Sequence, residues 1–133
     1  MTSGYSGTPL WKKLGLKDTM QACVVNPPDG YLDWLADGPA PVWGPPAPND
    51  AFTHVFTTFR AELDAVLSRT RETMARDGMI WASWPKKASK VPTDITEDTI
   101  REICLPMGLV DVKVCAVNEV WSGLKLMIRK ELR

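Results

Sequence analysis

The sequence predicts an α/β domain of three layers, in which helices cover both faces of a mostly parallel β-sheet. Three observations support this fold class. Apolar segments with the period of strands alternate along the chain with segments of helical period. The last two strand-like segments are separated by only a short turn, which predicts a carboxyl-terminal antiparallel hairpin. The chain has 133 residues, 44% of them hydrophobic, and this length suits one domain that spans residues 1–133.

The first part of the chain is predicted to contain one buried strand and a proline-rich loop. Residues 1–18 are polar, with a few apolar side chains that can dock a short helix. Residues 20–26 are an apolar run, which predicts a buried strand that ends in the loop Asn-Pro-Pro-Asp-Gly. A short helical turn is expected at residues 31–35. Residues 36–50 hold five prolines around Trp43, and because proline lacks a backbone donor we expect a stiff extended loop, neither helix nor central strand.

The middle of the chain changes from strand period to helical period and back. Residues 51–57 alternate with the two-residue period of a strand. Residues 63–74 place apolar side chains on one helical face, and Gly78 is predicted to stop this helix in a left-handed conformation. Residues 79–84 form another apolar run. This run predicts a buried strand that stops at Pro85 and leads into a small basic loop.

The last part of the chain predicts one helix and the hairpin. A helix is expected after Thr96, whose hydroxyl can cap the free amides of the first turn, and Gly108 follows its end. Residues 110–116 and 124–128 then alternate with the period of strands. Gly123 is expected to mark a bulge or bend. Together these elements predict a sheet of about five strands.

Charge and cysteine usage narrow the classes of function. Sixteen Lys and Arg residues balance sixteen Asp and Glu residues, so no net charge draws the protein to nucleic acid or to an anionic membrane. The three cysteines lie in apolar segments without CxxC spacing, which is typical of reduced core residues and not of a disulfide frame or metal site. Neither a signal peptide nor a membrane span of ~20 apolar residues is recognisable. We therefore expect a soluble cytoplasmic protein.

The basic loop after residues 79–84 is the predicted working surface. In parallel α/β sheets ligands bind beyond the carboxyl ends of the strands, where this loop and the loop of residues 26–30 are both expected. Lysine and serine side chains there can hold a phosphate or carboxylate, with the amides near Thr96 as a second anion site. The candidate ligand-binding residues are Lys86, Lys87, Ser89, Lys90, Asn26 and Asp29. The alternative is a solvated loop whose lysines only keep the protein soluble.

No complete catalytic or cofactor motif is present, so we assign no catalytic residue, cofactor or metal ligand. The only histidine, His54, lies in a predicted strand between two phenylalanines, which favours a hydrogen-bonded core or rim group over a catalyst. Residues 83–86 match the S-x-x-K motif of penicillin-recognising enzymes, in which the serine is the nucleophile. In those enzymes the motif begins a helix, whereas here it lies at the end of a predicted strand. Trp43 and Trp84 are candidate partner-binding residues, because aromatic side chains beside prolines can anchor a partner. The alternative for Trp43 is that it covers the sheet where a crossover helix is missing.

Three segments resemble a family of small bacterial proteins that has no assigned activity. They are Ser-Gly-Thr-Pro-Leu at residues 6–10, Trp-Pro-Lys-Lys-Ala-Ser-Lys at residues 84–90 and Val-Asn-Glu-Val-Trp-Ser-Gly-Leu at residues 117–124. The likeness spans nearly the whole chain.

More distantly, the order of elements is similar to that of class I S-adenosylmethionine-dependent methyltransferases, which have a Rossmann-like sheet with an antiparallel last strand. In this comparison residues 21–26 correspond to the first methyltransferase strand, which a glycine-rich turn should follow. Pro27 and Pro28 stand there instead, and the proline-rich loop displaces the strand whose terminal acid would hold the cofactor ribose.

The resemblance therefore implies a methyltransferase-like fold without its cofactor apparatus. We expect a non-catalytic module that binds a partner protein or a small anionic ligand, and a homo-oligomer is compatible with this role. The alternative is a divergent transferase that takes S-adenosylmethionine or a nucleotide through a rebuilt loop at residues 26–30.

Overall fold

The computed structural model describes residues 7–133, so residues 1–6, with the start of the predicted amino-terminal segment, lie outside the described residues. Within residues 7–133, six strands form one sheet. In the order in which they pair, these strands are β2 (Val42–Trp43), β1 (Gln21–Val25), β3 (Phe52–Phe56), β4 (Met79–Pro85), β6 (Trp121–Ile128) and β5 (Leu109–Ala116).

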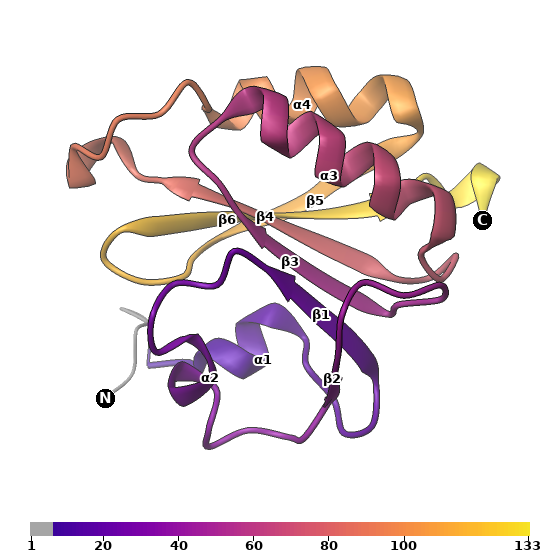
Figure 1. Ribbon diagram of the computed structural model, residues 1–133, viewed down its shortest axis with the longest axis horizontal. Coiled ribbons are helices and arrows are strands. Elements are labelled where there is room, and N and C mark those ends of the chain that lie inside the picture. Colours follow the sequence, from indigo (N-terminus) through magenta and orange to yellow (C-terminus); the bar gives the residue numbers. More distant parts are fainter. Residues whose placement is uncertain (1–6) are drawn as a thin grey trace.

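Helices lie on both faces of this sheet (Figure 1). The helices α3 (Arg60–Thr73) and α4 (Glu97–Cys104) cover one face, and the short helices α1 (Leu10–Leu14) and α2 (Tyr31–Trp34) lie on the other. Three 3-10 turns, η1 (Lys87–Ser89), η2 (Leu105–Met107) and η3 (Lys130–Leu132), complete the described elements. Strands β2, β1, β3 and β4 pair in parallel, whereas β6 runs antiparallel to both β4 and β5. The three-layer α/β class and the carboxyl-terminal hairpin are confirmed.

The proline-rich segment supplies the strand that exceeds the expected number of about five. Val42 and Trp43 pair in parallel with Gln21 and Ala22 at the edge of the sheet. The prolines on either side explain why this strand is so short, because proline cannot donate to a strand ladder. The segment is therefore extended, as predicted, but part of it belongs to the sheet.

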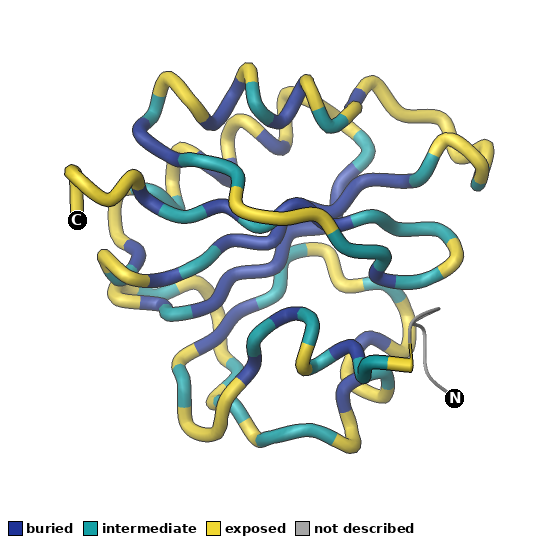
Figure 2. The backbone as a smooth tube through the Cα atoms, turned by 180° about the vertical axis from the view of Figure 1, so that it is seen from behind, coloured by how far each residue is buried: buried dark blue, intermediate teal, exposed yellow. Residues whose placement is uncertain are grey.

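The two faces of the sheet bury separate apolar cores. Leu67 of α3 lies in the core under α3 and α4, and Leu14 of α1 lies in the opposite core. Because successive strand side chains point to opposite faces, Trp81 and Trp84 enter different cores, as the sequence predicts. Figure 2 shows the central strands buried along most of their length and the outer loops exposed.

Two glycine predictions are wrong. Helix α3 ends because the residue after Thr73 already has extended backbone, and Gly78 does not have a positive φ. A Cβ at Gly78 would lie 2.9 Å from the carbonyl oxygen of Asp50, so close backbone approach is what requires glycine there. Gly123 pairs regularly within β6, and the bulge lies instead at Val112 in β5.

The predicted limits of α4 are confirmed. Thr96 Oγ1 accepts a hydrogen bond from the Thr99 amide at 3.2 Å, and Thr99 Oγ1 accepts one from the Thr96 amide at 3.1 Å. This reciprocal capping box satisfies two of the amides that a helix start leaves open. Gly108, with φ of 85°, ends the turn that follows α4. None of the helices in residues 7–133 is long and apolar enough to cross a membrane.

Candidate ligand-binding site

A cavity of about 570 Å³ opens beside the carboxyl end of β4, between the basic loop of residues 85–90 and the start of α4. We call it the Trp84 cavity. Its lining combines an apolar part with lysine, threonine and glutamate side chains; the lining residues are Trp84, Pro85, Lys87, Lys90, Val91, Pro92, Thr93, Ile95, Thr96 and Glu97. Ligand sites usually have this composition, mostly apolar walls with a few polar groups.

Strand β4 positions the apolar wall of the cavity. Trp84 shares its face of the sheet with Ala82 and Ile80, and all three belong to the core under α3 and α4. Trp84 is only 8% exposed, packed in the same core as Ile95. The ring is therefore held in place by the core while it also lines the cavity.

The basic loop is held by its own backbone hydrogen bonds. The Lys86 amide donates to the carbonyl oxygen of Val120 at 2.7 Å, which ties the loop to the hairpin. Ser89 Oγ donates to the Lys86 carbonyl oxygen at 2.6 Å, and Lys90 adopts a left-handed φ of 60°. This conformation lets Lys87 and Lys90 line the cavity, whereas Lys86 and Ser89 are not among its lining residues. The Ser89 hydroxyl, predicted as an anion donor, closes the turn.

The start of α4 adds charge of both signs. Glu97 forms an ion pair with Arg101, and Asp98 lies 3.0 Å from the same guanidinium. The Thr99 amide is occupied by the Thr96 hydroxyl. Because these carboxylates and the capping box already complement the helix start, the structure does not favour the second anion site predicted at these amides.

The loop of residues 26–30 does not join the Trp84 cavity. Asn26 has a positive φ of 56°, and its Nδ2 donates to the Phe56 carbonyl oxygen at 3.2 Å, which fastens the ends of β1 and β3 together. Asp29 is exposed. This loop leads into α2 on one face of the sheet, whereas the basic loop leads toward α4 on the other. Neither Asn26 nor Asp29 lines the cavity, because the two connections leave the sheet edge in opposite directions.

The two candidate partner-binding tryptophans differ in burial. Trp43 is half-buried and meets Tyr31 and Phe52 edge-on, with ring centroids 5.9 and 6.0 Å away. Trp43 belongs to the short edge strand β2 and covers the sheet from there, which is the alternative that the sequence leaves open. Trp84 is buried and lines the Trp84 cavity.

The only histidine is a core residue, as the sequence predicts. His54 is fully buried and stacks on Phe56, with ring centroids 4.2 Å apart. Its Nδ1 lies 2.9 Å from the Tyr31 hydroxyl, and its Nε2 lies 2.8 Å from Ser83 Oγ. Burial lowers the pKa of His54 to about 3. Ser83 lies inside strand β4 and bonds to His54, so the S-x-x-K interpretation is excluded.

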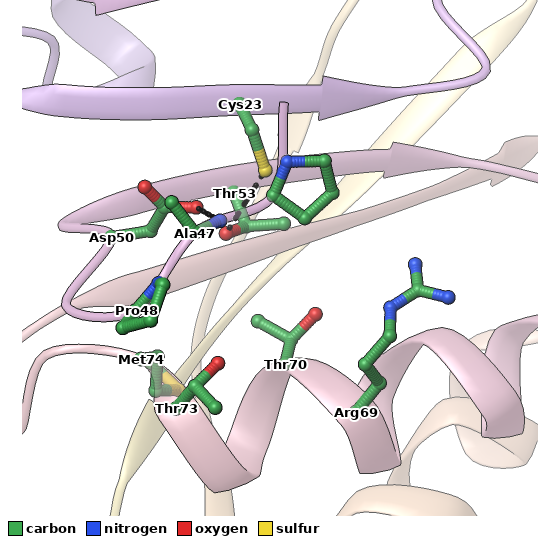
Figure 3. Close-up of a pocket in the computed structure, with 10 residues that line it drawn as sticks. Cys23, Ala47, Pro48, Asp50, Thr53, Arg69, Thr70, Thr73 and Met74 are labelled. Carbon is green, nitrogen blue, oxygen red and sulfur yellow. Dashed lines mark hydrogen bonds between the residues drawn. The ribbon is translucent and has the colours of Figure 1, made fainter. Parts of the chain in front are cut away.

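A second cavity, of about 190 Å³, lies between β1, α3 and the proline-rich segment (Figure 3). Asp50 accepts hydrogen bonds from Gln21 Nε2 at 2.9 Å and from the Ala47 amide at 3.0 Å. The Cys23 thiol lies 3.6 Å from Thr53 Oγ1, and burial raises its pKa. The two hydrogen bonds to Asp50 attach the proline-rich segment to the sheet. The residues of the described part hold no cluster of His, Cys, Asp and Glu side chains suited to a metal ion.

Comparison with known proteins identifies the fold. No protein-family profile and no curated protein matches the sequence. Among solved structures, the chain is similar to one described as a "putative type 11 methyltransferase" from Sulfolobus solfataricus, with a TM-score of 0.65, 13% identity, and coverage of 97% of this chain and 95% of that one.

Two further similar structures carry S-adenosylmethionine. Aeropyrum pernix fibrillarin, with natively bound S-adenosylmethionine, gives a TM-score of 0.54 at 9% identity and covers 89% of this chain and 73% of its own. LepI in complex with S-adenosylmethionine gives a TM-score of 0.59 at 12% identity, over 95% of this chain and 48% of that one. The chain thus spans about half the length of LepI. At such identities the similarity concerns the fold alone, and the chain has the Rossmann-like fold of class I methyltransferases.

Proposed function

We propose that the protein is a binding module that holds a small anionic ligand in the Trp84 cavity. One observation carries this proposal: Lys87 and Lys90 line a cavity of about 570 Å³ whose remaining wall is largely apolar. Lysines provide point charges for a phosphate or carboxylate, and a flat apolar wall suits the rest of an organic anion. The cavity lies at the carboxyl edge of β4, where open α/β sheets usually bind ligands.

The polar groups in this cavity support binding more than catalysis. The Thr93 hydroxyl donates to the Thr58 carbonyl oxygen at 2.8 Å, and Thr96 caps α4. Glu97 is paired with Arg101. Each of these groups has a structural partner, whereas a nucleophile needs a neighbouring base to activate it.

A second candidate function is that of a divergent transferase, and the similar structures support it more than they support a binding module. Several of them are methyltransferases or hold S-adenosylmethionine. Here the cofactor would use the loop of residues 26–30, where Asn26 and Gly30 have positive φ values of 56° and 82°. The residues do not fit the cofactor well, because Pro27 and Pro28 offer no backbone donors and Gly44 follows β2 where an acid would hold the ribose.

Titration of the protein with S-adenosylmethionine separates the two candidates. We expect calorimetry to detect no binding in the micromolar range, because Pro27 and Pro28 leave two positions of this loop without a backbone amide to donate to the ligand. Micromolar binding, which corresponds to about −8 kcal/mol, would favour the transferase.

The ligand of the Trp84 cavity can be sought in a thermal-shift screen of nucleotides, phosphates and acidic metabolites. We expect at least one anion to raise the Tm of the wild-type protein, and the double variant Lys87→Gln/Lys90→Gln to lose this rise. The variant itself should change the free energy of unfolding by less than about 0.5 kcal/mol, since both lysines are exposed. A Lys17→Gln/Lys130→Gln variant, which removes two other exposed lysines, is the matched control. Equal shifts in all three proteins would contradict the proposal.

A further inference from the structure

Two lysines of the carboxyl-terminal hairpin lie side by side on the face of the sheet opposite to the Trp84 cavity, the face that helix α1 with Lys13 also covers. Lys113 of β5 and Lys125 of β6 are direct partners in the antiparallel ladder. Lys125 is also paired with Trp81, which belongs to the core beneath α1 and α2. Because residues directly opposite in a ladder share a face, both lysines lie on this side. Burial raises the pKa of the Cys115 thiol, and the charges of Lys13 in α1 and of Lys113 lower it by less.

The bulge in β5 brings about this arrangement. In a regular strand, residues two apart point to the same face, so Asp111 would accompany Lys113. Instead Asp111 pairs with Leu126, whose side chain lies in the core under α4, and the register shifts before Lys113. Asp111 then lies 3.0 Å from Arg101 of α4. The bulge therefore places the acid on one face and the lysine on the other, a way of redirecting a side chain that bulges commonly provide.

The lysine pair is unfavourable by itself. Like charges directly opposite in a ladder repel each other, and Lys125 is half-buried. Burial first, and then the charge of Lys113, lower the pKa of Lys125. None of the ion pairs in residues 7–133 includes Lys13, Lys113 or Lys125. An anion bound between these side chains would relieve the repulsion.

We propose that Lys113 and Lys125, here called the lysine face, bind a phosphorylated small molecule. Lysine supplies concentrated charge without the fixed fork of arginine, so the lysine face should select multiply charged oxyanions over single carboxylates. This site is separate from the Trp84 cavity because the sheet lies between them. The zero net charge of the chain is the reason to favour a small phosphorylated ligand over nucleic acid.

Inorganic pyrophosphate is the probe for the first test. It should raise the Tm of the wild-type protein above the value in sodium chloride of equal ionic strength, and Lys113→Gln/Lys125→Gln should abolish this rise. We expect each lost lysine to weaken pyrophosphate binding by about tenfold or more. The variant Lys87→Gln/Lys90→Gln on the other face should keep the full shift. An unchanged wild-type Tm, or equal shifts in both double variants, would overturn the proposal.

Two further readouts do not depend on that double variant. Without any ligand and at low salt, the single variant Lys113→Gln should have a higher Tm than the wild-type protein, because the repulsion is gone. In the wild-type protein, pyrophosphate should slow the acylation of Lys125 and Lys113, followed by mass spectrometry, and should leave the exposed Lys130 unchanged. Labelling that pyrophosphate slows equally at all three lysines, or at none, would show that no site exists on this face.

Discussion

Replacing Trp81 by alanine should lower the free energy of unfolding by about 3–5 kcal/mol, the range observed when a large buried aromatic side chain is truncated. Trp81 is fully buried at the centre of the core beneath α1 and α2. Its Nε1 donates a hydrogen bond of 2.9 Å to the carbonyl oxygen of Leu14, at the end of α1. The substitution therefore opens a cavity and also releases α1 from β4. Urea unfolding followed by circular dichroism measures the change.

Two matched variants test the reason for this loss. Trp81→Phe keeps most of the ring volume but loses the hydrogen bond to Leu14, so it should be destabilised less than Trp81→Ala. Trp43→Ala removes a tryptophan that is only half-buried at the sheet edge, and it should also be milder. A loss in Trp81→Ala that is no larger than the loss in Trp43→Ala would mean that the described core does not carry the stability of this face.

Acid should destabilise the protein through His54. The pKa of His54 falls from 6.5 in the unfolded chain to about 3 in the folded protein, because burial disfavours the charged ring. Below pH 6.5 the unfolded chain therefore binds a proton that the folded protein does not. The contribution of His54 is fully present above this pH and is lost as the pH falls towards 3, at about 1.4 kcal/mol per pH unit. Unfolding free energies measured by urea titration between about pH 7 and 4 follow this loss.

The variant His54→Gln isolates this effect from that of the carboxylates. Glutamine has a donor and an acceptor but does not titrate, so the difference in slope between the two proteins belongs to the histidine. The variant is expected to be less stable at neutral pH, because an amide does not reproduce the stacking on Phe56 or both bonds to Tyr31 and Ser83. Identical slopes in the two proteins would contradict the buried neutral ring.

The candidate site was only partly predictable. The basic loop after β4 was predicted at the carboxyl edge of the sheet, because an apolar run that stops at Pro85 leaves few other places for Lys87 and Lys90. Asn26 and Asp29 were also expected at this site, but they do not line the cavity. Each loop turns toward the face of the sheet on which the next helix packs, and the two loops lead to helices on opposite faces. No local pattern records that choice.

Local periodicity determined the elements themselves. The alternation around Trp81 placed it and Trp84 on opposite faces, and the Thr96 cap fixed the start of α4, because these features depend on residues close together in the sequence. Only the tertiary structure decided which segments meet. Three features depend on a partner that is distant in sequence. They are the edge strand at Val42, the need for glycine at position 78 beside the Asp50 carbonyl oxygen, and the bulge that separates Asp111 from Lys113. Such pairings follow from the packing of the whole sheet, which a reading of neighbouring residues does not contain.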